Sequence, residues 1–87
     1  MHVSGYVWDS VTRKGIPDVC VFYGTFSCPG ETTTDANGFY AVDLWIGSGN
    51  LRWALTYSHS GYQTAGPIVL AGRSGDVTQN IFLRKLP

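Results

Sequence analysis

The segment Thr32–Val42, TTTDANGFYAV, places a run of threonines before a glycine turn and an alternating aromatic stretch after it. Threonine and aromatic residues suit a pleated strand, whereas Asp35, Asn37 and Gly38 tolerate a left-handed backbone and cap their own turn. The segment therefore predicts two strands joined by a tight hairpin. Gly38 is expected at positive φ, because a Cβ disfavours that conformation.

The same turn raises the question of a metal ion. A calcium loop needs several oxygen ligands, spaced as in Asp-x-Asp-x-Asp-Gly with a later bidentate Glu. Only Asp35 and Asn37 are available here, and apolar Phe39 and Tyr40 follow them. We therefore predict a structural turn without a metal.

The chain has 87 residues with six basic and six acidic side chains, so its formal net charge is zero. This length makes one small domain, and we treat residues 1–87 as a single unit. Because the Lys/Arg residues form no cluster larger than an adjacent pair such as Arg84-Lys85, we expect no nucleic-acid partner and no basic membrane-binding face. No apolar run approaches the roughly 20 residues of a membrane span, and a signal for export would lie outside this chain.

Short β-branched and aromatic runs, separated by turn residues at intervals of about 8–12 residues, predict an all-β sandwich. The polar segment 9–18 is expected to be a loop. The predicted strands lie near residues 2–8, 19–25, 31–35, 38–46, 51–59, 66–71 and 77–84.

Alternation along these strands assigns the two faces of each sheet. The side chains predicted to face the core are Val3, Gly5, Val7, Val19, Val21, Tyr23, Tyr40, Val42, Leu44, Trp53, Leu55, Tyr57, Ile81 and Leu83. The aromatic side chains predicted to face outward are Tyr6, Trp8, Phe22, Phe39, Trp45 and Phe82. For a neutral domain this small, that outward aromatic content is the feature most informative about function.

Groups suited to catalysis are scattered along the chain. His2 lies at the N-terminus and His59 at a predicted strand end, and no Gly-x-Ser-x-Gly elbow supports Ser58 or Ser60 as a nucleophile. The carboxylates fall mostly in predicted turns or strand ends, where capping or solubility explains them. We predict no catalytic residue, no cofactor and no enzymatic activity.

Five pieces together give a family resemblance that covers nearly the whole chain: VSGYVWD at 3–9, GIPDVCV at 15–21, TDANGFY at 34–40, SGY at 60–62 and NIFL at 80–83. In this order they resemble the carboxypeptidase regulatory-like domain of the prealbumin-like (transthyretin-like) superfamily. The resemblance implies a seven-stranded Greek-key β-sandwich of immunoglobulin-like type, without an active site. It also implies an accessory module of a secreted or cell-surface protein.

The two cysteines admit two interpretations. Cys20 and Cys28 would form a disulfide if they oppose each other across a hairpin with their Cα atoms within about 7 Å. Alternatively, both are reduced thiols, as in a cytosolic protein. The resemblance points outside the cell and so favours the Cys20–Cys28 disulfide. A zinc site is disfavoured, since it would have to recruit both histidines from distant strand ends.

The outward aromatic residues leave two hypotheses about function. In the first, they pack on a companion domain or protein subunit, a second copy of the chain included, because large exposed apolar patches commonly mark interfaces. In the second, Trp8 and Trp45, with Tyr6 or Phe39, form a stacking platform for a polysaccharide. A third interpretation has some of these rings covered by their own loops or by the long 9–18 connection.

Overall fold

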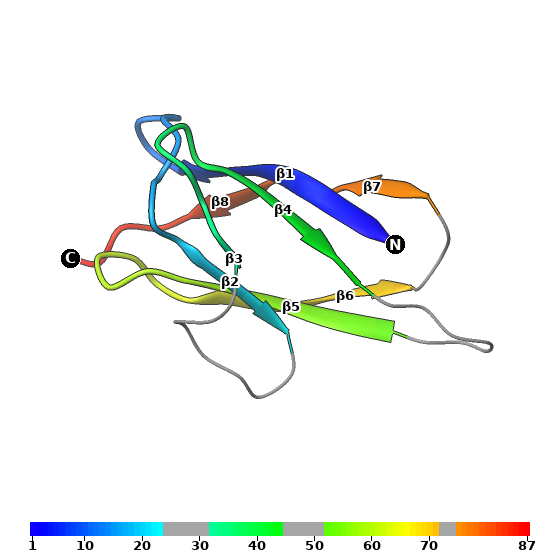
Figure 1. The fold of residues 1–87 in the computed structure, drawn as a ribbon. Coiled ribbons are helices and arrows are strands. Elements are labelled where there is room, and N and C mark those ends of the chain that lie inside the picture. Colours follow the sequence, from blue (N-terminus) through cyan, green and yellow to red (C-terminus); the bar gives the residue numbers. More distant parts are fainter. Residues whose placement is uncertain (24–31, 45–51, 72–74) are drawn as a thin grey trace.

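The computed structural model describes residues 1–23, 32–44, 52–71 and 75–87, and these ranges form eight strands in two sheets (Figure 1). No helix long and apolar enough to cross a membrane occurs among the described residues. The strands are β1 (His2–Asp9), β2 (Cys20–Tyr23), β3 (Thr32–Thr33), β4 (Phe39–Asp43), β5 (Arg52–Ser58), β6 (Ala65–Ala71), β7 (Asp76–Thr78) and β8 (Ile81–Leu83).

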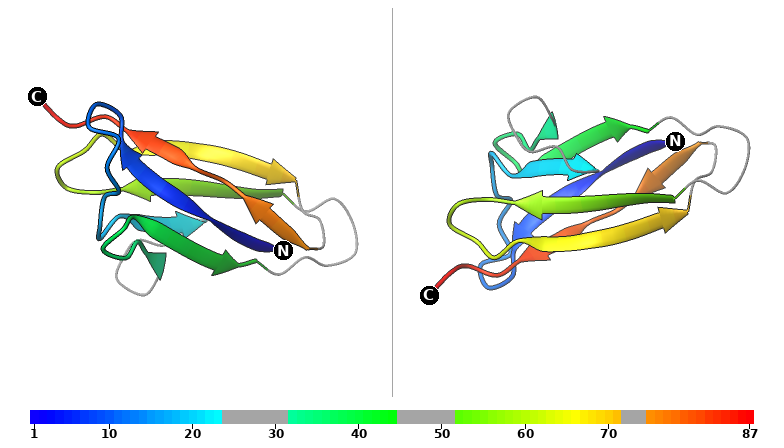
Figure 2. Two further views of the ribbon diagram at one scale, coloured as in Figure 1. Left: turned by 90° about the horizontal axis from the view of Figure 1, so that it is seen from above. Right: turned by 90° about the horizontal axis from the view of Figure 1, so that it is seen from below.

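The two sheets stack as a sandwich, which confirms the predicted β-sandwich class (Figure 2). In the first sheet, β1 pairs antiparallel with β4 on one side. On its other side it pairs parallel with β7 along its first half and with β8 along its second half. The second sheet has the order β3-β2-β5-β6. β1 is therefore the central strand of the first sheet, and its outward side chains lie between those of β4 and β8.

The predicted last strand, 77–84, is interrupted between β7 and β8. Here the chain approaches β1 so closely that a Cβ on Gly5 would collide with the Gln79 carbonyl. The Gln79 amide donates to the Ser4 carbonyl at 2.9 Å, and the Asn80 side-chain oxygen accepts from the Tyr6 amide at 2.9 Å. Because a side chain accepts the bond that a strand carbonyl would otherwise accept, the ladder breaks, and the described residues form eight strands where seven were predicted.

The turn at 35–38 has the predicted chemistry. Gly38 has a φ of 81°. The Asp35 carboxylate accepts hydrogen bonds from the amides of Asn37 (2.8 Å) and Phe39 (3.0 Å). The turn is thus capped by Asp35, as the sequence predicts.

The prediction that this turn closes a two-stranded hairpin is wrong. β3 pairs with β2 in the second sheet, whereas β4 pairs with β1 in the first. The crossing begins at Thr34, whose buried hydroxyl donates to the Ile16 carbonyl at 2.6 Å and accepts from the Val19 amide at 2.9 Å. These bonds hold Thr34 beside β2, so that the turn passes the chain from one sheet to the other.

The core lies between the sheets, and most of its members are those that alternation predicts. Two predicted members, Trp53 and Ile81, are only partly buried and pack against its margin, and the side chain of Tyr23 lies outside the described residues. Ile16, from the segment predicted as a polar loop, is an additional member. The fully or nearly buried apolar residues are Val3, Val7, Ile16, Val19, Val21, Tyr40, Val42, Leu44, Leu55, Tyr57 and Leu83.

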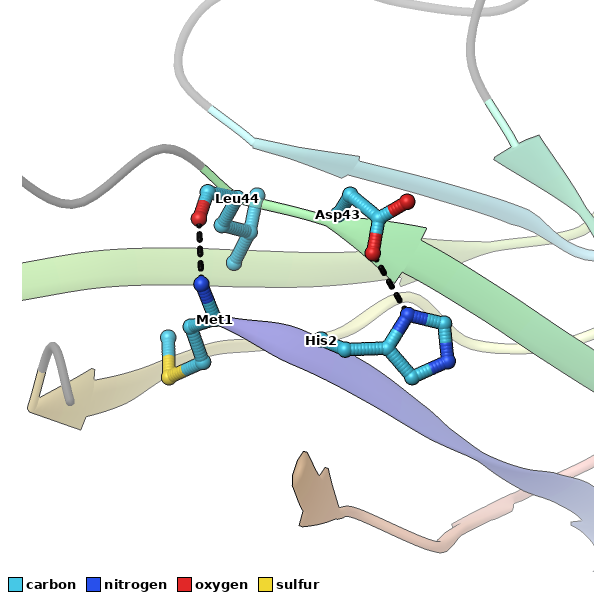
Figure 3. Close-up of polar contacts among 4 residues, drawn as sticks. All are labelled: Met1, His2, Asp43 and Leu44. Carbon is cyan, nitrogen blue, oxygen red and sulfur yellow. Dashed lines mark hydrogen bonds and ion pairs between the residues drawn. The ribbon is translucent and has the colours of Figure 1, made fainter. Parts of the chain in front are cut away.

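The start of β1 is fastened to the end of β4 (Figure 3). The Met1 amino group donates to the Leu44 carbonyl at 2.8 Å, and the Leu44 amide donates to the Met1 carbonyl at 2.7 Å. Beside them, His2 Nδ1 lies 2.5 Å from Asp43 Oδ1 in an exposed pair. Backbone pairing, rather than this solvent-screened contact, sets the register of β1 against β4.

Candidate functional site

Four aromatic side chains form one continuous strip on the outer face of the first sheet: Phe39, Tyr6, Trp8 and Phe82, hereafter the aromatic strip. β1 supplies Tyr6 and Trp8, which share a face because they are two residues apart. Tyr6 is the register partner of Phe39 on β4, and Trp8 is the register partner of Phe82 on β8. Cross-strand pairing therefore extends the two rings of β1 on both sides.

Each ring of the aromatic strip contacts the next. The Tyr6 and Trp8 ring centroids are 5.7 Å apart with planes 5° apart, an offset-stacked arrangement. Tyr6 meets Phe39 edge-on at 5.3 Å, and Trp8 meets Phe82 at 5.2 Å with a 38° tilt. The strip is an ordered ridge of rings that support one another.

Three of the four rings of the aromatic strip are exposed to solvent. Tyr6 is 40%, Phe39 37% and Phe82 46% exposed, while Trp8 is half-buried. The outward orientation predicted for these four residues is therefore confirmed. Of the other two predicted surface residues, Phe22 is half-buried on β2 of the second sheet and does not join the strip, and Trp45 lies outside the described residues.

At the Phe82 end, the aromatic strip borders a surface cavity of about 330 Å³, open to solvent and lined by Trp8, Arg13 and Phe82. The Arg13 guanidinium carbon lies 4.8 Å from the centroid of the Phe82 ring, a cation–π geometry. The 9–18 connection thus reaches the aromatic strip at this end, but it leaves Phe82 46% exposed, so the third interpretation, in which the rings are covered, does not hold for Phe82. The connection adds a cation to the site, which sequence reasoning missed.

Asp9 builds the loop that carries Arg13. Its side chain is 6% exposed, and one carboxylate oxygen accepts from the amides of Val11 (2.8 Å) and Thr12 (3.0 Å). The Arg13 amide then donates to the Asp9 carbonyl at 2.9 Å. Arg13 takes a φ of 62°, a left-handed conformation uncommon for a residue with a long side chain.

The second Asp9 oxygen accepts the Tyr62 hydroxyl at 2.8 Å. The hydrogen bonds from Thr12, Val11 and Tyr62, opposed in part by burial and aided by the nearby charge of Lys85, hold the pKa of Asp9 below its ordinary value. The same bond to Asp9 raises the pKa of Tyr62. Asp9 is therefore an ionised anchor for the loop, with both carboxylate oxygens occupied.

Two glycines let the loop approach β1. A Cβ on Gly15 would collide with the Asn37 carbonyl, and a Cβ on Gly38 would lie 2.5 Å from the Val7 carbonyl oxygen and 2.8 Å from Gly15 Cα. The loop and the 35–38 turn therefore interlock beside Val7. This contact positions the loop next to Trp8, which forms an isolated bridge with Gly15.

Other residues singled out from the sequence do not join this site. His59 closes β5, and its Nδ1 accepts from the Gly61 amide at 3.0 Å. Cys20 is buried on β2 and is disulfide-bonded. Cys28 lies outside the described residues, so the Cys20–Cys28 pairing stays a prediction. Within the described ranges, no three His, Cys, Asp or Glu side chains gather in a geometry that would hold a metal ion.

Comparison with known proteins returns a likeness of fold. No protein-family model and no curated protein sequence matches the chain. Among solved structures, the chain is similar to one from a C-terminal interface mutant of the type II cohesin–X-dockerin complex of Acetivibrio cellulolyticus, with 15% identity and a TM-score of 0.59. The match covers 93% of this chain and 52% of that one, so this chain spans about half the length of the chain it matches. The shared feature is the β-sandwich.

Proposed function

We propose that this protein is a non-catalytic interaction module that uses the aromatic strip to pack on a companion domain or protein subunit. The observation that carries the proposal is the continuity of Phe39, Tyr6, Trp8 and Phe82 across three strands of one sheet. Aromatic residues are enriched at the centres of protein interfaces because they bury large areas at a small cost in side-chain entropy. A ridge of mutually supported rings is preorganised for such contact.

The ring geometry favours a protein partner over a polysaccharide. A sugar-binding platform presents flat ring faces to solvent, where sugar C–H groups stack on them. Tyr6 and Trp8 turn their faces towards each other, with planes 5° apart, and Trp8 also contacts Phe82. Rings engaged with one another in this way are less free to stack on a sugar, whereas their apolar surface and the Tyr6 hydroxyl suit the mixed apolar and polar surface of a protein.

The same proposal includes the setting of the module, a larger secreted or cell-surface protein. The carboxypeptidase regulatory-like resemblance describes an accessory sandwich beside another domain of a secreted or cell-surface protein, without an active site. The likeness to a chain of a cohesin–X-dockerin complex supports the sandwich architecture on which this proposal depends. In that setting the companion of the aromatic strip is a neighbouring domain, another subunit or a second copy of the chain.

Trp8→Ala tests the proposal, with Phe22→Ala as the matched control because Phe22 is a half-buried aromatic on the other sheet. Self-association is measured by sedimentation, and docking by titration with the domains that adjoin this one in its parent protein. We expect Trp8→Ala to weaken one of these contacts at least tenfold and Phe22→Ala to change it less than twofold. Equal effects of both variants, or retardation by neutral polysaccharides that depends on Trp8, would contradict the proposal.

A further inference from the structure

We propose that the cavity at the Phe82 end of the aromatic strip receives a carboxylate-bearing side chain of a protein partner, which pairs with Arg13 beside an apolar group seated against Trp8 and Phe82. This inference rests on the proposed function and assigns the chemistry of the partner at one point. The partner is a protein segment in which an aspartate or glutamate adjoins an aromatic or aliphatic residue.

Arg13 carries a charge that the described residues leave unpaired. Among the described residues, the side-chain contact with the geometry of an ion pair is that of His2 with Asp43, at the start of β1. Asp9, close to Arg13 in sequence, uses both oxygens on Val11, Thr12 and Tyr62. Within the described part of the chain, the Arg13 guanidinium therefore retains its donors for a ligand that approaches from solvent, and a planar guanidinium matches the two oxygens of a carboxylate.

The position of Arg13 is built by the fold. A left-handed backbone is unfavourable for a residue with a Cβ, so the contacts around Arg13 must hold it in place. The buried Asp9 carboxylate caps Val11 and Thr12, and the Arg13 amide closes the turn on the Asp9 carbonyl. The result places the guanidinium over Phe82 and beside the cavity. Backbone strain that the surroundings maintain in this way is often found at binding sites.

The size and the charge of this end fit the proposed ligand. The cavity, of about 330 Å³ and open to solvent, has room for one or two side chains to lie against Trp8, Arg13 and Phe82. Lys14 in the same loop and Arg84, two residues beyond Phe82, are also exposed cations. At the opposite end of the strip, the exposed carboxylate beside Phe39 belongs to Asp35 and accepts two backbone amides. The cation that lines the cavity is Arg13, so an acidic partner residue seated there meets its guanidinium first.

The test uses the 87-residue chain labelled with ¹⁵N and two blocked dipeptides that differ only in charge, acetyl-Phe-Glu-amide and acetyl-Phe-Gln-amide. The Trp8 indole N–H, assigned from a Trp8→Phe variant, reports binding in low salt. We expect the Glu peptide to bind about three- to fivefold more tightly than the Gln peptide, as for a partly exposed ion pair. Arg13→Asn keeps a residue that tolerates the left-handed backbone and should abolish this preference, whereas Lys14→Gln should retain it.

Equal affinity for both peptides in the unaltered chain, or no binding of either, would overturn the carboxylate site. A shift of the Trp8 signal by trigalacturonate but not by the Glu peptide would also overturn it, because the carboxylate would then belong to a polysaccharide. If domain docking depends on Trp8 but not on Arg13, the carboxylate site fails while the proposed function stands. If docking is insensitive to Trp8 as well, the proposed function fails with it.

Discussion

The hydroxyl oxygens of Tyr40 on β4 and Tyr57 on β5 lie 2.7 Å apart in the core and join the two sheets. The Tyr40 hydroxyl donates to the Gln79 carbonyl at 2.6 Å, so the hydrogen between the two tyrosines comes from Tyr57. The rings meet edge-on at 5.5 Å. This chain of bonds reaches the interruption between β7 and β8, and it ties that break in the first sheet to the centre of the second.

The order of the bonds predicts unequal effects of two conservative substitutions. Tyr40→Phe removes the acceptor of Tyr57 and the donor to Gln79, and it should lower the free energy of unfolding by about 2–3 kcal/mol. Tyr57→Phe removes one donor and leaves the Tyr40–Gln79 bond intact, so it should cost about 1 kcal/mol. Urea denaturation measures both values. Equal losses would show that the bonds are not ordered in this way.

The same pair predicts sensitivity to alkali. Burial, the largest cause, raises the pKa of both Tyr40 and Tyr57 above the ordinary value of 10.0. A raised pKa in the folded state means that stability is intact below pH 10.0 and falls as the pH rises beyond it. Tyrosinate absorbance should therefore show some tyrosines ionising only as the chain unfolds. In the double Phe variant that late fraction should be smaller.

Asp9 predicts a loss of stability in acid. Its pKa is held below the ordinary 3.8, first by the Thr12 and Val11 amides. A lowered pKa in the folded state adds stability above pH 3.8, and this contribution disappears as the pH falls through the folded-state pKa. Asp9→Asn, which cannot ionise, should be less stable at neutral pH and should lose less between about pH 5 and pH 2. The control is Asp43→Asn, because Asp43 is an exposed carboxylate on β4, opposite His2 at the start of β1. An acid profile of Asp9→Asn that matches that of the unaltered chain would contradict the anchor role.

Alanine substitutions at Gly38 and Gly75 distinguish the cost of a strained backbone from the cost of steric crowding. Both have positive φ, 81° and 96°, but a Cβ on Gly38 would press on Val7 and Gly15, whereas one on Gly75 would meet nothing within 4 Å. Gly75→Ala should cost about 1 kcal/mol from conformation alone, and Gly38→Ala about 3–4 kcal/mol, because overpacking adds to it. Thermal melts give the comparison. Similar losses of stability in the two variants would mean that the 9–18 loop and the 35–38 turn move apart at little energetic cost.

Cys20 predicts the redox state of the chain. Because Cys20 is disulfide-bonded and the chain holds two cysteines, protein folded in oxidising buffer should show no titratable thiol after denaturation. We predict that the bond joins Cys20 to Cys28 and contributes about 2–3 kcal/mol for a loop this short. Non-reducing peptide mapping identifies the bond, and Cys28→Ser measures its contribution. Two reactive thiols, or a disulfide-linked dimer, would refute the intramolecular pairing.

The sequence predicts those features of the fold that depend on residues close together in the chain. Alternation within β1 assigns Val7 to the core and Trp8 to the outer face, and the residues of the 35–38 turn assign Gly38 its positive φ. Both properties are local, since side-chain direction in a strand and turn geometry depend on a few neighbouring residues. They were predicted correctly for that reason.

Tertiary structure alone decided which strands lie side by side, because strand pairing depends on contacts between distant parts of the chain that no local pattern encodes. It sent Phe39 and Phe82 to opposite sides of β1, where they complete the aromatic strip, and it left Phe22 on the other sheet. Arg13 lies in a segment whose sequence indicates only a polar loop, because its neighbouring residues do not predict a positive φ at this position. Its place over Phe82 follows from the burial of Asp9 and the pairing of β8 with β1, and both exist only in the folded chain.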